Sequence, residues 1–491
     1  MNAPHTGFIE QACWEGKAFS QGWRVLERGT IEVREPASDA RIANVGCAGP
    51  DDVVRAGAAA RAAQPGWAAK LPTERAAVLD KAASLLIQHE DELIDWIMRE
   101  SGSIQPKAKI EIEHGAGFIR HAAAAAVEPT GLLLPSIDAG RSSYARRVPH
   151  GVVGVISPFN FPLVLSIRAI AAALALGNAV VHKPDPRTPI SGGVIIARIF
   201  EAAGLPKDLL HILPGGADVG EAMCVDRNIA MISFTGSAAA GSRVGALAGQ
   251  HLKKVQLELG GKNALIILDD ADAEVAASNA AWGTFLHQGQ ICMSTGLVLV
   301  QEGIADALVA SLAERAARLP VGDPASGQVA LGPIIGDEPV RRIQDIIDDA
   351  VGKGARVLAG GTHNGRFVAA TVLDGVRPGM RAFDEEIFGP VACVTRFTTD
   401  DEAVELANTS DYGLAAGVIS ASVGRARALG EQLQVGHLHI NDQTVNGGPF
   451  APFGGRGKSG NGSRVSGPAL WEEFTQWMWV TSKDQATPYP F

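Results

Sequence analysis

Residues 230–257, AMISFTGSAAAGSRVGALAGQHLKKVQL, decide the fold class of this chain. Residues 230–234 form an apolar run with the length of a buried strand, and residues 254–257 form another. Residues 238–248, between the two runs, are expected to form a helix, and a Thr-Gly-Ser turn leads into it. A strand, a helix and a second strand in this order predict a βαβ crossover in a mainly parallel sheet that helices cover on both faces.

The same alternation begins earlier in the chain. Residues 152–156, 179–182 and 210–213 are predicted strands, and residues 189–203 are a predicted helix. In such sheets ligands bind at the carboxyl ends of the strands. The loops that follow these strands are therefore where we expect the chemistry.

A second α/β unit is predicted further along the chain. Its signals are apolar runs at residues 264–268, 297–300 and 391–397, together with a helical pattern at residues 303–318. The chain therefore contains two units of alternating strands and helices.

Before residue 150 the chain is predicted to be helical. Asp51 is expected to cap a helix that ends near residues 65–66, and further helices are predicted over residues 73–100 and 107–125. Residues 142–147 and 474–482 predict two strands outside the main sheets. Such strands need something to pair with, and a partner subunit is the simplest answer.

Composition and charge exclude several classes of protein. With 491 residues, 46% of them hydrophobic and 20% charged, the chain is long enough for two or three globular domains and is not intrinsically disordered. A net charge of −10 argues against nucleic acid as a partner. Glycines and prolines interrupt the apolar stretch 148–167, which is expected to be buried core and not a membrane span. The N-terminus lacks a signal-peptide pattern, so a cytoplasmic location is expected.

Five cysteines are spread over the chain without a CxxC pair or a Cys/His spacing suited to zinc. This pattern predicts reduced thiols, mostly buried, and no metal site. Cys292 differs, because it lies in FLHQGQICMSTG (285–296), among small and amide residues with no acidic neighbour to raise its pKa. Such surroundings suit a nucleophilic thiolate, although a structural role is the alternative from this segment alone.

Two further residues follow predicted strands. Glu258 comes directly after the run 254–257 and before two glycines, where a carboxylate can reach a site and take a proton. Asn160 lies in SPFNFP (157–162), where prolines and aromatic residues fix the loop and the amide can serve as a neutral donor to an oxyanion. A solvated acid and a turn-forming asparagine are the alternatives.

The sequence also suggests a site for phosphate groups. Residues 233–237, SFTGS, lead from a strand through a tight turn into a helix, which presents backbone N–H groups and a positive helix end. Lys183, after the strand in GNAVVHKPD, could bind ribose or phosphate oxygens. By contrast, the glycines at 455, 457 and 460 match a dinucleotide fingerprint only as a string, because no apolar helix follows them. They are expected to form flexible backbone near a pocket.

Taken together, these features identify a family. The chain resembles the aldehyde dehydrogenase superfamily over essentially its whole length, and within it the bacterial benzaldehyde dehydrogenases. The motifs that carry the resemblance are PFNFP, GNAVVHKP, SFTGS, LELGGKN, GQIC, EEIFGPV (385–391) and PFGGRGKSG (452–460).

The resemblance implies a role for each matching position. Cys292 is expected to be the nucleophile, Glu258 the general base and Asn160 a donor to the oxyanion. Cofactor contacts are implied for Ile156, Ser157, Pro158, Lys183, Gly216, Phe234, Gly236, Ser237, Gly241, Leu259, Glu386 and Phe388. Positions that line the substrate tunnel fall on Val164, Leu165, Arg168, Leu286, Ile291 and Met293.

The resemblance also implies a domain organisation. We expect a Rossmann-like cofactor domain (1–126 and 149–257), an α/β catalytic domain (258–467) and a small β oligomerisation element (127–148 and 468–491). A homodimer or homotetramer is expected.

The implied reaction oxidises an aldehyde to a carboxylic acid through a thiohemiacetal and a thioester on Cys292. NAD is the expected cofactor, with NADP as the alternative, because Pro186 replaces a glutamate that many members use to bind the adenosine ribose and Arg187 follows it. No metal is implied.

The tunnel positions are mostly apolar, which favours benzaldehyde and substituted benzaldehydes. The alternative is a semialdehyde such as succinate semialdehyde, whose carboxylate Arg168 could bind. Two further alternatives are less consistent with the sequence. An acylating dehydrogenase generally lacks the glutamate base, and a non-catalytic binding protein would not need Cys292, Glu258 and Asn160 together.

Overall fold

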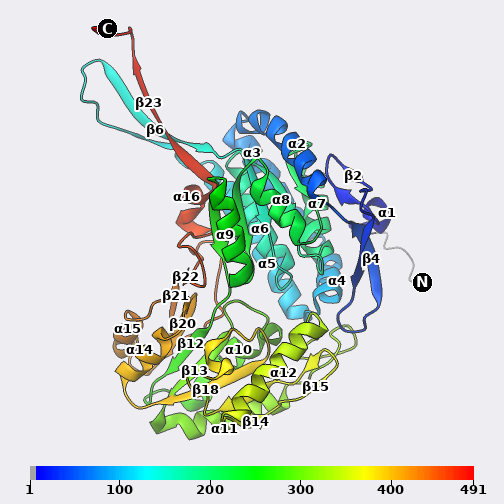
Figure 1. Ribbon diagram of the computed structural model, residues 1–491, viewed down its shortest axis with the longest axis vertical. Coiled ribbons are helices and arrows are strands. Elements are labelled where there is room, and N and C mark those ends of the chain that lie inside the picture. The colour runs from blue at the N-terminus through cyan, green and yellow to red at the C-terminus, as the bar shows by residue number, and fades with distance from the viewer. Residues whose placement is uncertain (1–6) are drawn as a thin grey trace.

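The computed structural model describes residues 7–491, so residues 1–6 of the predicted cofactor domain lie outside the described residues. Two seven-stranded sheets, each covered by helices, form two lobes, and a thin β arm extends away from one of them (Figure 1). This arrangement confirms the predicted α/β class with a Rossmann-like unit, a second α/β unit and a small β element.

The first sheet has the order β11-β10-β7-β8-β9-β1-β2. Five neighbouring strands, from β11 at one edge to β9, pair in parallel and match the predicted runs to within one residue at each end. They are β7 (Val152–Ile156), β8 (Ala179–Lys183), β9 (Leu210–Ile212), β10 (Ile229–Thr235) and β11 (Lys254–Glu258). The short strands β1 (Ala18–Phe19) and β2 (Trp23–Arg24) extend the sheet antiparallel, and the sequence analysis did not predict them.

Helices cover both faces of this sheet. They are α2 (Pro50–Ala68), α3 (Pro72–Gln88), α4 (Glu90–Ser101), α5 (Gln105–Ala126), α6 (Pro162–Ala175), α7 (Ile195–Ala203), α8 (Ala217–Val225) and α9 (Ala238–Gln250). Every residue of α6 is buried, which accounts for the second half of the apolar stretch 148–167. Within residues 7–491 no helix is both long and apolar enough to cross a membrane.

Three details of the N-terminal helices differ from the prediction. Gly49, not Asp51, is the N-cap of α2, and the Asp52 carboxylate accepts its backbone N–H at 2.9 Å. The helix continues through Pro65 to Ala68. The predicted helix 73–100 is two helices, because His89 leaves the helical conformation between them (φ −111°, ψ 21°). Residues 30–46, for which no element was predicted, form the hairpin of β3 (Thr30–Arg34) and β4 (Arg41–Gly46).

The second sheet has the order β14-β17-β18-β13-β12-β20-β21 and is parallel except at β14. Its strands are β12 (Asn263–Ile267), β13 (Thr295–Gln301), β14 (Arg356–Ala359), β17 (Thr371–Asp374), β18 (Val391–Phe397), β20 (Ala415–Ile419) and β21 (His437–Ile440). The covering helices are α10 (Ala273–Phe285), α11 (Glu302–Arg318), α12 (Asp337–Gly352), α14 (Asp400–Asn408) and α15 (Val423–Gly430). Strands β12, β13 and β18 and helix α11 correspond to the predicted elements.

The two strands predicted outside the main sheets pair with each other. β23 (Thr475–Lys483) runs antiparallel to β6 (Arg141–Pro149) over nine residue pairs, and β5 (Gly131–Leu133) adds a third strand. The expectation that a partner subunit supplies their pairing was therefore wrong, since the chain's own distant segments do so. The three-stranded arm projects from the molecule with the C-terminus at its tip (Figure 1).

Candidate active site

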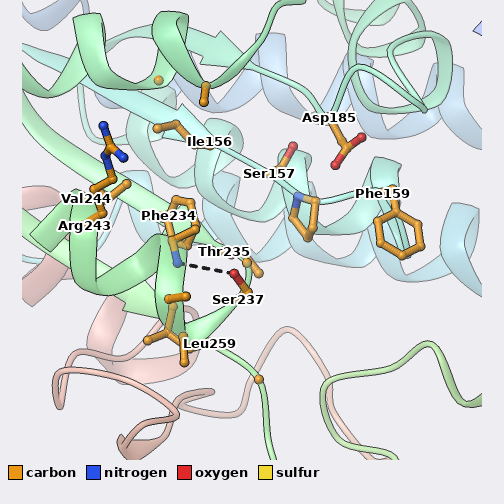
Figure 2. A pocket seen from close by; sticks show the side chains of 18 of the residues that line it. Ile156, Ser157, Phe159, Asp185, Phe234, Thr235, Ser237, Arg243, Val244 and Leu259 are labelled. Carbon is orange, nitrogen blue, oxygen red and sulfur yellow. Dashed lines mark hydrogen bonds between the residues drawn. The ribbon is translucent and has the colours of Figure 1, made fainter. Parts of the chain in front are cut away.

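The carboxyl ends of the first sheet meet at one cleft. Ile156, Lys183, Thr235 and Glu258 are the last residues of β7, β8, β10 and β11, and the first three line a cavity of about 770 Å³. Figure 2 shows Arg243 and Val244 of α9 on one side of this cleft, and Asp185 and Phe159 on the other. The ligand site thus lies where the parallel sheet predicts it.

Most of the predicted cofactor residues line this cleft. The lining residues among them are Ile156, Ser157, Pro158, Lys183, Gly216, Phe234, Gly236, Ser237, Leu259, Glu386 and Phe388. Gly241 does not line the cleft. A Cβ built there would lie 2.3 Å from Cδ2 of Leu259, so the glycine lets Leu259 pack against α9 and acts on the cleft indirectly.

The turn before α9 is arranged to receive an anion. Ser237 caps the helix, and its hydroxyl accepts the N–H of Ala240 at 3.3 Å (Figure 2). The first turn of the helix therefore directs its remaining N–H groups and the positive end of its dipole toward the cleft. Lys183 lies in the same cleft, with its Nζ donating to the carbonyl of Pro184 at 3.3 Å. Burial lowers the pKa of this ammonium.

Two residues of the cleft that sequence reasoning did not pair form a bidentate ion pair. Arg187 donates from Nε and Nη2 to the two oxygens of Asp185, at 2.8 and 2.7 Å. Its guanidinium also lies 4.2 Å from the centroid of the Phe159 ring. Asp185 and Arg187 both line the cleft, so Asp185 neutralises the positive charge of Arg187 there.

Glu386 and Phe388 close the cleft from the second unit. Glu386 Oε1 accepts the N–H of Gly261 at 3.0 Å, and burial raises the pKa of its carboxyl to about 7. A Cβ on Gly260 would lie 2.0 Å from Oε2 of Glu386, so a larger residue there would force this carboxylate to move. Phe388 adopts a left-handed backbone (φ 57°), and its ring packs edge-on against Phe159 at 5.9 Å.

Cys292 lines the same cleft at the end of an unusual loop. His287, Gln288 and Gly289 all have left-handed backbones, with φ of 49°, 55° and 67°. Such conformations cost energy for residues with a side chain and are held by their surroundings. Gln288 supplies part of this support, because its side chain donates to the carbonyls of Gly102 and Pro333 at 3.2 and 3.0 Å.

The electrostatic surroundings of Cys292 differ from the prediction. Burial raises the pKa of its thiol to about 12, the nearby Arg168 charge opposes this shift, and Glu386 and Glu258 add to it. The expectation of no acidic neighbour was therefore wrong. It considered only residues adjacent in sequence, whereas both glutamates come from other elements. A group that removes the thiol proton is needed at neutral pH.

Side chains from other segments hold the loop of Cys292 in place. Asn263, the first residue of β12, donates from Nδ2 to the carbonyls of Cys292 and Ser294, both at 2.8 Å. Thr444 donates to the carbonyl of Met293 at 2.7 Å. Neither residue was singled out in the sequence, although Asn263 belongs to the LELGGKN motif.

Asn160 lies opposite this loop and is buried. Its Nδ2 donates to the carbonyl of Gln290 at 2.9 Å, two residues before Cys292. A carboxamide nitrogen carries two hydrogens. One of them anchors the side chain to the loop of Cys292, and the other is available for an oxygen atom in the cleft.

Glu258 is 2% exposed, and both of its carboxylate oxygens lack a hydrogen-bond partner among the described residues. Burial raises the pKa of this carboxyl to about 8, while the charges of Arg168 and Arg464 oppose the shift and Glu473 adds to it. A buried carboxyl with free oxygens and a raised pKa is a stronger base than an ordinary carboxylate, and in its ionised form it can take a proton from water or from a thiol.

The predicted substrate positions occupy two segments that flank Asn160 and Cys292. Val164, Leu165 and Arg168 lie on α6, and Leu286, Ile291 and Met293 lie on the loop before and after Cys292. Of these six, only Leu165 lines the cleft described above. Arg168 is buried, donates to the Thr235 hydroxyl at 3.1 Å and stacks over the Phe453 ring at 4.9 Å.

The glycine string near the C-terminus forms a loop and not a helix start. β22 (Arg456–Gly457) pairs with β19 (Tyr412–Gly413), and Gly460 makes a β-bridge with Glu258. The neighbouring Ser459 carbonyl accepts the N–H of Leu259 at 3.1 Å. This loop therefore supports the backbone beside Glu258.

Among residues 7–491, no three metal-ligating side chains are placed to share an ion.

Comparison with known proteins identifies the family of this chain. The model of the aldehyde dehydrogenase family matches residues 23–480. A vanillin dehydrogenase from an Amycolatopsis species is 52% identical, over 99% of this chain and 100% of its own length. An NAD⁺-dependent benzaldehyde dehydrogenase from Pseudomonas putida is 48% identical, over 98% and 99% of the two chains. The crystal structure of a salicylaldehyde dehydrogenase from P. putida G7, complexed with salicylaldehyde, superposes with a TM-score of 0.94 at 37% identity over 97% and 99%.

The fold and the cleft define a dehydrogenase that uses a nicotinamide cofactor and a cysteine. The chain belongs to the aldehyde dehydrogenase family. It is thus an oxidoreductase that acts on an aldehyde with NAD(P).

Proposed function

We propose that this protein oxidises aromatic aldehydes of the benzaldehyde type to carboxylic acids, with Cys292 as nucleophile, Asn160 as oxyanion donor and Glu258 as general base. One observation carries the proposal. Cys292 and Asn160 line one end of the cofactor cleft, and the unpartnered Glu258 carboxyl is close enough to raise the pKa of the Cys292 thiol. The aromatic relatives at 52% and 48% identity support the substrate class.

Each residue then has a defined task. Glu258 takes the thiol proton, and the Cys292 sulfur attacks the aldehyde carbon. The free N–H of Asn160 and the backbone N–H of Cys292 hold the resulting oxyanion, and removing one such donor costs about 10²- to 10³-fold in rate. A bound nicotinamide would supply the hydride acceptor, and loss of hydride from the adduct would leave a thioester on Cys292. After Glu258 has released this first proton to solvent, it removes a proton from the water that hydrolyses the thioester, and the carboxylic acid leaves as the Cys292 sulfur is set free.

The cleft fits a nicotinamide dinucleotide. Lys183 and the first turn of α9 supply positive charge for ribose or phosphate oxygens. The glycines before α8 and α9 keep the backbone accessible there, and Glu386 and Phe388 line the cleft from the other unit. These are the residues that we propose hold the cofactor.

NAD is the proposed cofactor in preference to NADP. A 2′-phosphate would need an unpaired cation, but the Nε–Nη2 edge of Arg187 is already bonded to both oxygens of Asp185. The Asp185 carboxylate also adds a negative charge to the cleft, which repels a phosphate.

Asp185→Asn is expected to raise the ratio of kcat/KM for NADP to that for NAD by about tenfold, because it removes a repulsive charge and leaves Arg187 unpaired. Initial rates with both cofactors at saturating aldehyde measure this ratio. Asp337→Asn is the matched control. The Asp337 Oδ1 atom accepts a hydrogen bond from Arg366 Nε at 2.7 Å, and this pair lies outside the cleft. An unchanged ratio in Asp185→Asn would exclude the ion pair as the determinant.

The geometry of Arg168 favours an aromatic substrate over a semialdehyde. Its guanidinium is buried, bonded to Thr235 and stacked on Phe453, and its charge acts on both Glu258 and Cys292. A residue engaged in this way is poorly placed to clamp a substrate carboxylate with two parallel hydrogen bonds.

A panel of aldehydes tests the proposed substrate class. Benzaldehyde and a hydroxylated benzaldehyde are expected to give kcat/KM at least about tenfold above succinate semialdehyde and a medium-chain aliphatic aldehyde. Formation of reduced cofactor gives the initial rates. A preference for succinate semialdehyde would assign the alternative function and make Arg168 the carboxylate ligand.

The arm supports a proposal about assembly. Leu133 and Trp479 on its strands are 93% and 69% exposed, which is unusual for large apolar side chains on a sheet. We propose that residues 127–148 and 468–491 join subunits of a homodimer or homotetramer, beside a cofactor domain of residues 1–126 and 149–257 and a catalytic domain of residues 258–467. Light scattering on the purified chain distinguishes these assemblies from a monomer.

A further inference from the structure

Helix α5 carries an ion pair that the proposed reaction does not use. Lys107 and Glu111 lie one helical turn apart, with Nζ and Oε2 separated by 2.6 Å, and their side chains are 1% and 0% exposed. Removing two charges from water is costly, so a buried pair is weak grounds for stability and needs another explanation.

Both members of the pair bond to the segment that carries Asn160. Lys107 Nζ donates to the carbonyl of Asn160 at 2.7 Å. Glu111 Oε1 accepts the N–H of Leu163 at 2.8 Å and that of Val164 at 3.3 Å. The pair thus connects α5 to the loop that precedes α6 and to the first turn of that helix.

The Lys107 ammonium also packs on Phe161, which lies between Asn160 and Leu163 in the sequence. Lys107 Nζ lies 4.2 Å from the centroid of the Phe161 ring, and His287 of the nucleophile's loop meets that ring edge-on at 5.6 Å. Burial and the Lys107 charge lower the pKa of His287 well below its usual value, so this ring stays neutral. Lys107 therefore contacts the loop of Asn160 directly, and it is linked to the loop of Cys292 through the rings of Phe161 and His287.

Asn160 has few other restraints. Residues 157–161 belong to no helix or strand, so no regular ladder of hydrogen bonds fixes them. The Asn160 side chain donates one N–H to Gln290, and Lys107 holds its backbone carbonyl. Two points of attachment determine the direction in which the second amide N–H points.

We propose that Lys107 and Glu111 are positioning residues for the oxyanion donor: they clamp residues 160–164 so that the free N–H of Asn160 is aimed at the reacting oxygen. This inference rests on the proposed role of Asn160. It explains why a charged pair occupies an interior position, because charge-assisted hydrogen bonds fix a backbone segment more firmly than apolar contacts do.

The double variant Lys107→Met/Glu111→Leu tests the clamp, since it removes both charges together and leaves no single unpaired charge in the interior. We expect kcat for benzaldehyde to fall about 10- to 100-fold through misplacement of the donor. The affinity for NAD and the rate of Cys292 alkylation by iodoacetamide should stay as in the unmodified protein, whereas the melting temperature should fall, because the N–H groups of Leu163 and Val164 lose their acceptor. Lys70→Met is the matched control, because its i,i+4 pair with Glu74 is exposed.

A double-mutant cycle with Asn160→Ala separates positioning from general damage. In the Asn160→Ala background the clamp variant should cost less than twofold more, since the group that it positions is already gone. Full additivity of the two losses would overturn the inference and leave the role of Asn160 intact. Full activity of Asn160→Ala alone would overturn both.

If the double variant does not fold, Glu111→Gln takes its place in the same cycle. The glutamine keeps an acceptor for the N–H groups of Leu163 and Val164 and removes only the charge that holds Lys107. A smaller loss of kcat, again absent in the Asn160→Ala background, would support the clamp, and an additive loss would overturn it.

Discussion

Cys292→Ser is expected to lower the rate of benzaldehyde oxidation by about 10⁴-fold or more, as loss of a covalent nucleophile does in other enzymes. A serine hydroxyl has a far higher pKa than a thiol, and the raised thiol pKa of about 12 already requires a base for deprotonation. Formation of reduced cofactor measures the rate. Cys224, on α8, also lines the cleft.

Two controls make this result specific. The affinity of Cys292→Ser for NAD should be unchanged, because the proposed cofactor contacts come from other residues. Cys13→Ser, which alters a half-buried thiol on α1 (Gln11–Trp14), should keep full activity. Residual oxidation within tenfold of the unmodified protein would remove Cys292 from the nucleophile role.

Glu258→Gln is expected to slow steady-state turnover by about 10²- to 10⁴-fold, the usual contribution of a general base. The substitution keeps the shape of a buried side chain that has no hydrogen-bond partner, so the fold should tolerate it. Because Glu258 is proposed to act on the hydrolytic water, rapid mixing with aldehyde and NAD should show one burst of reduced cofactor per active site and then a slow phase.

The burst distinguishes the two steps in which Glu258 is proposed to act. The burst should also be slower than in the unmodified protein, because Glu258 is proposed to take the proton of Cys292, whose thiol pKa its charge raises. Glu472→Gln is the control, because the Glu472 side chain is 63% exposed. This variant should show no burst and normal turnover. Rapid steady turnover in Glu258→Gln would exclude it as the base.

The strands in the middle of each sheet were predictable because each is a short apolar run, and helices on both faces of the sheet bury it. β7 and β18 were predicted to the residue for this reason. The hairpin of β3 and β4 was missed, since only four of its strand residues are buried and its strands show little of the apolar signal of a core strand. The break at His89 was also missed, because helical spacing of apolar residues continues across it.

The reactive residues could be found from sequence because they follow strands or lie in specific motifs. Their surroundings could not. The acidic neighbours of Cys292, the support from Asn263 and the pairing of Asp185 with Arg187 all depend on tertiary contacts or on rotamers. Lys107 and Glu111 looked like ordinary helix residues, because a helical pattern alone does not show that a charged pair is buried.

Peptide mass spectrometry of Glu258→Gln, quenched in acid after mixing with benzaldehyde and NAD, tests the central claim most directly. We predict a benzoyl group on the peptide that contains Cys292, present only when both reactants are added and absent in Glu258→Gln/Cys292→Ser. An unmodified Cys292 peptide alongside a full burst of reduced cofactor would contradict the account, because oxidation would then proceed without a thioester on this residue.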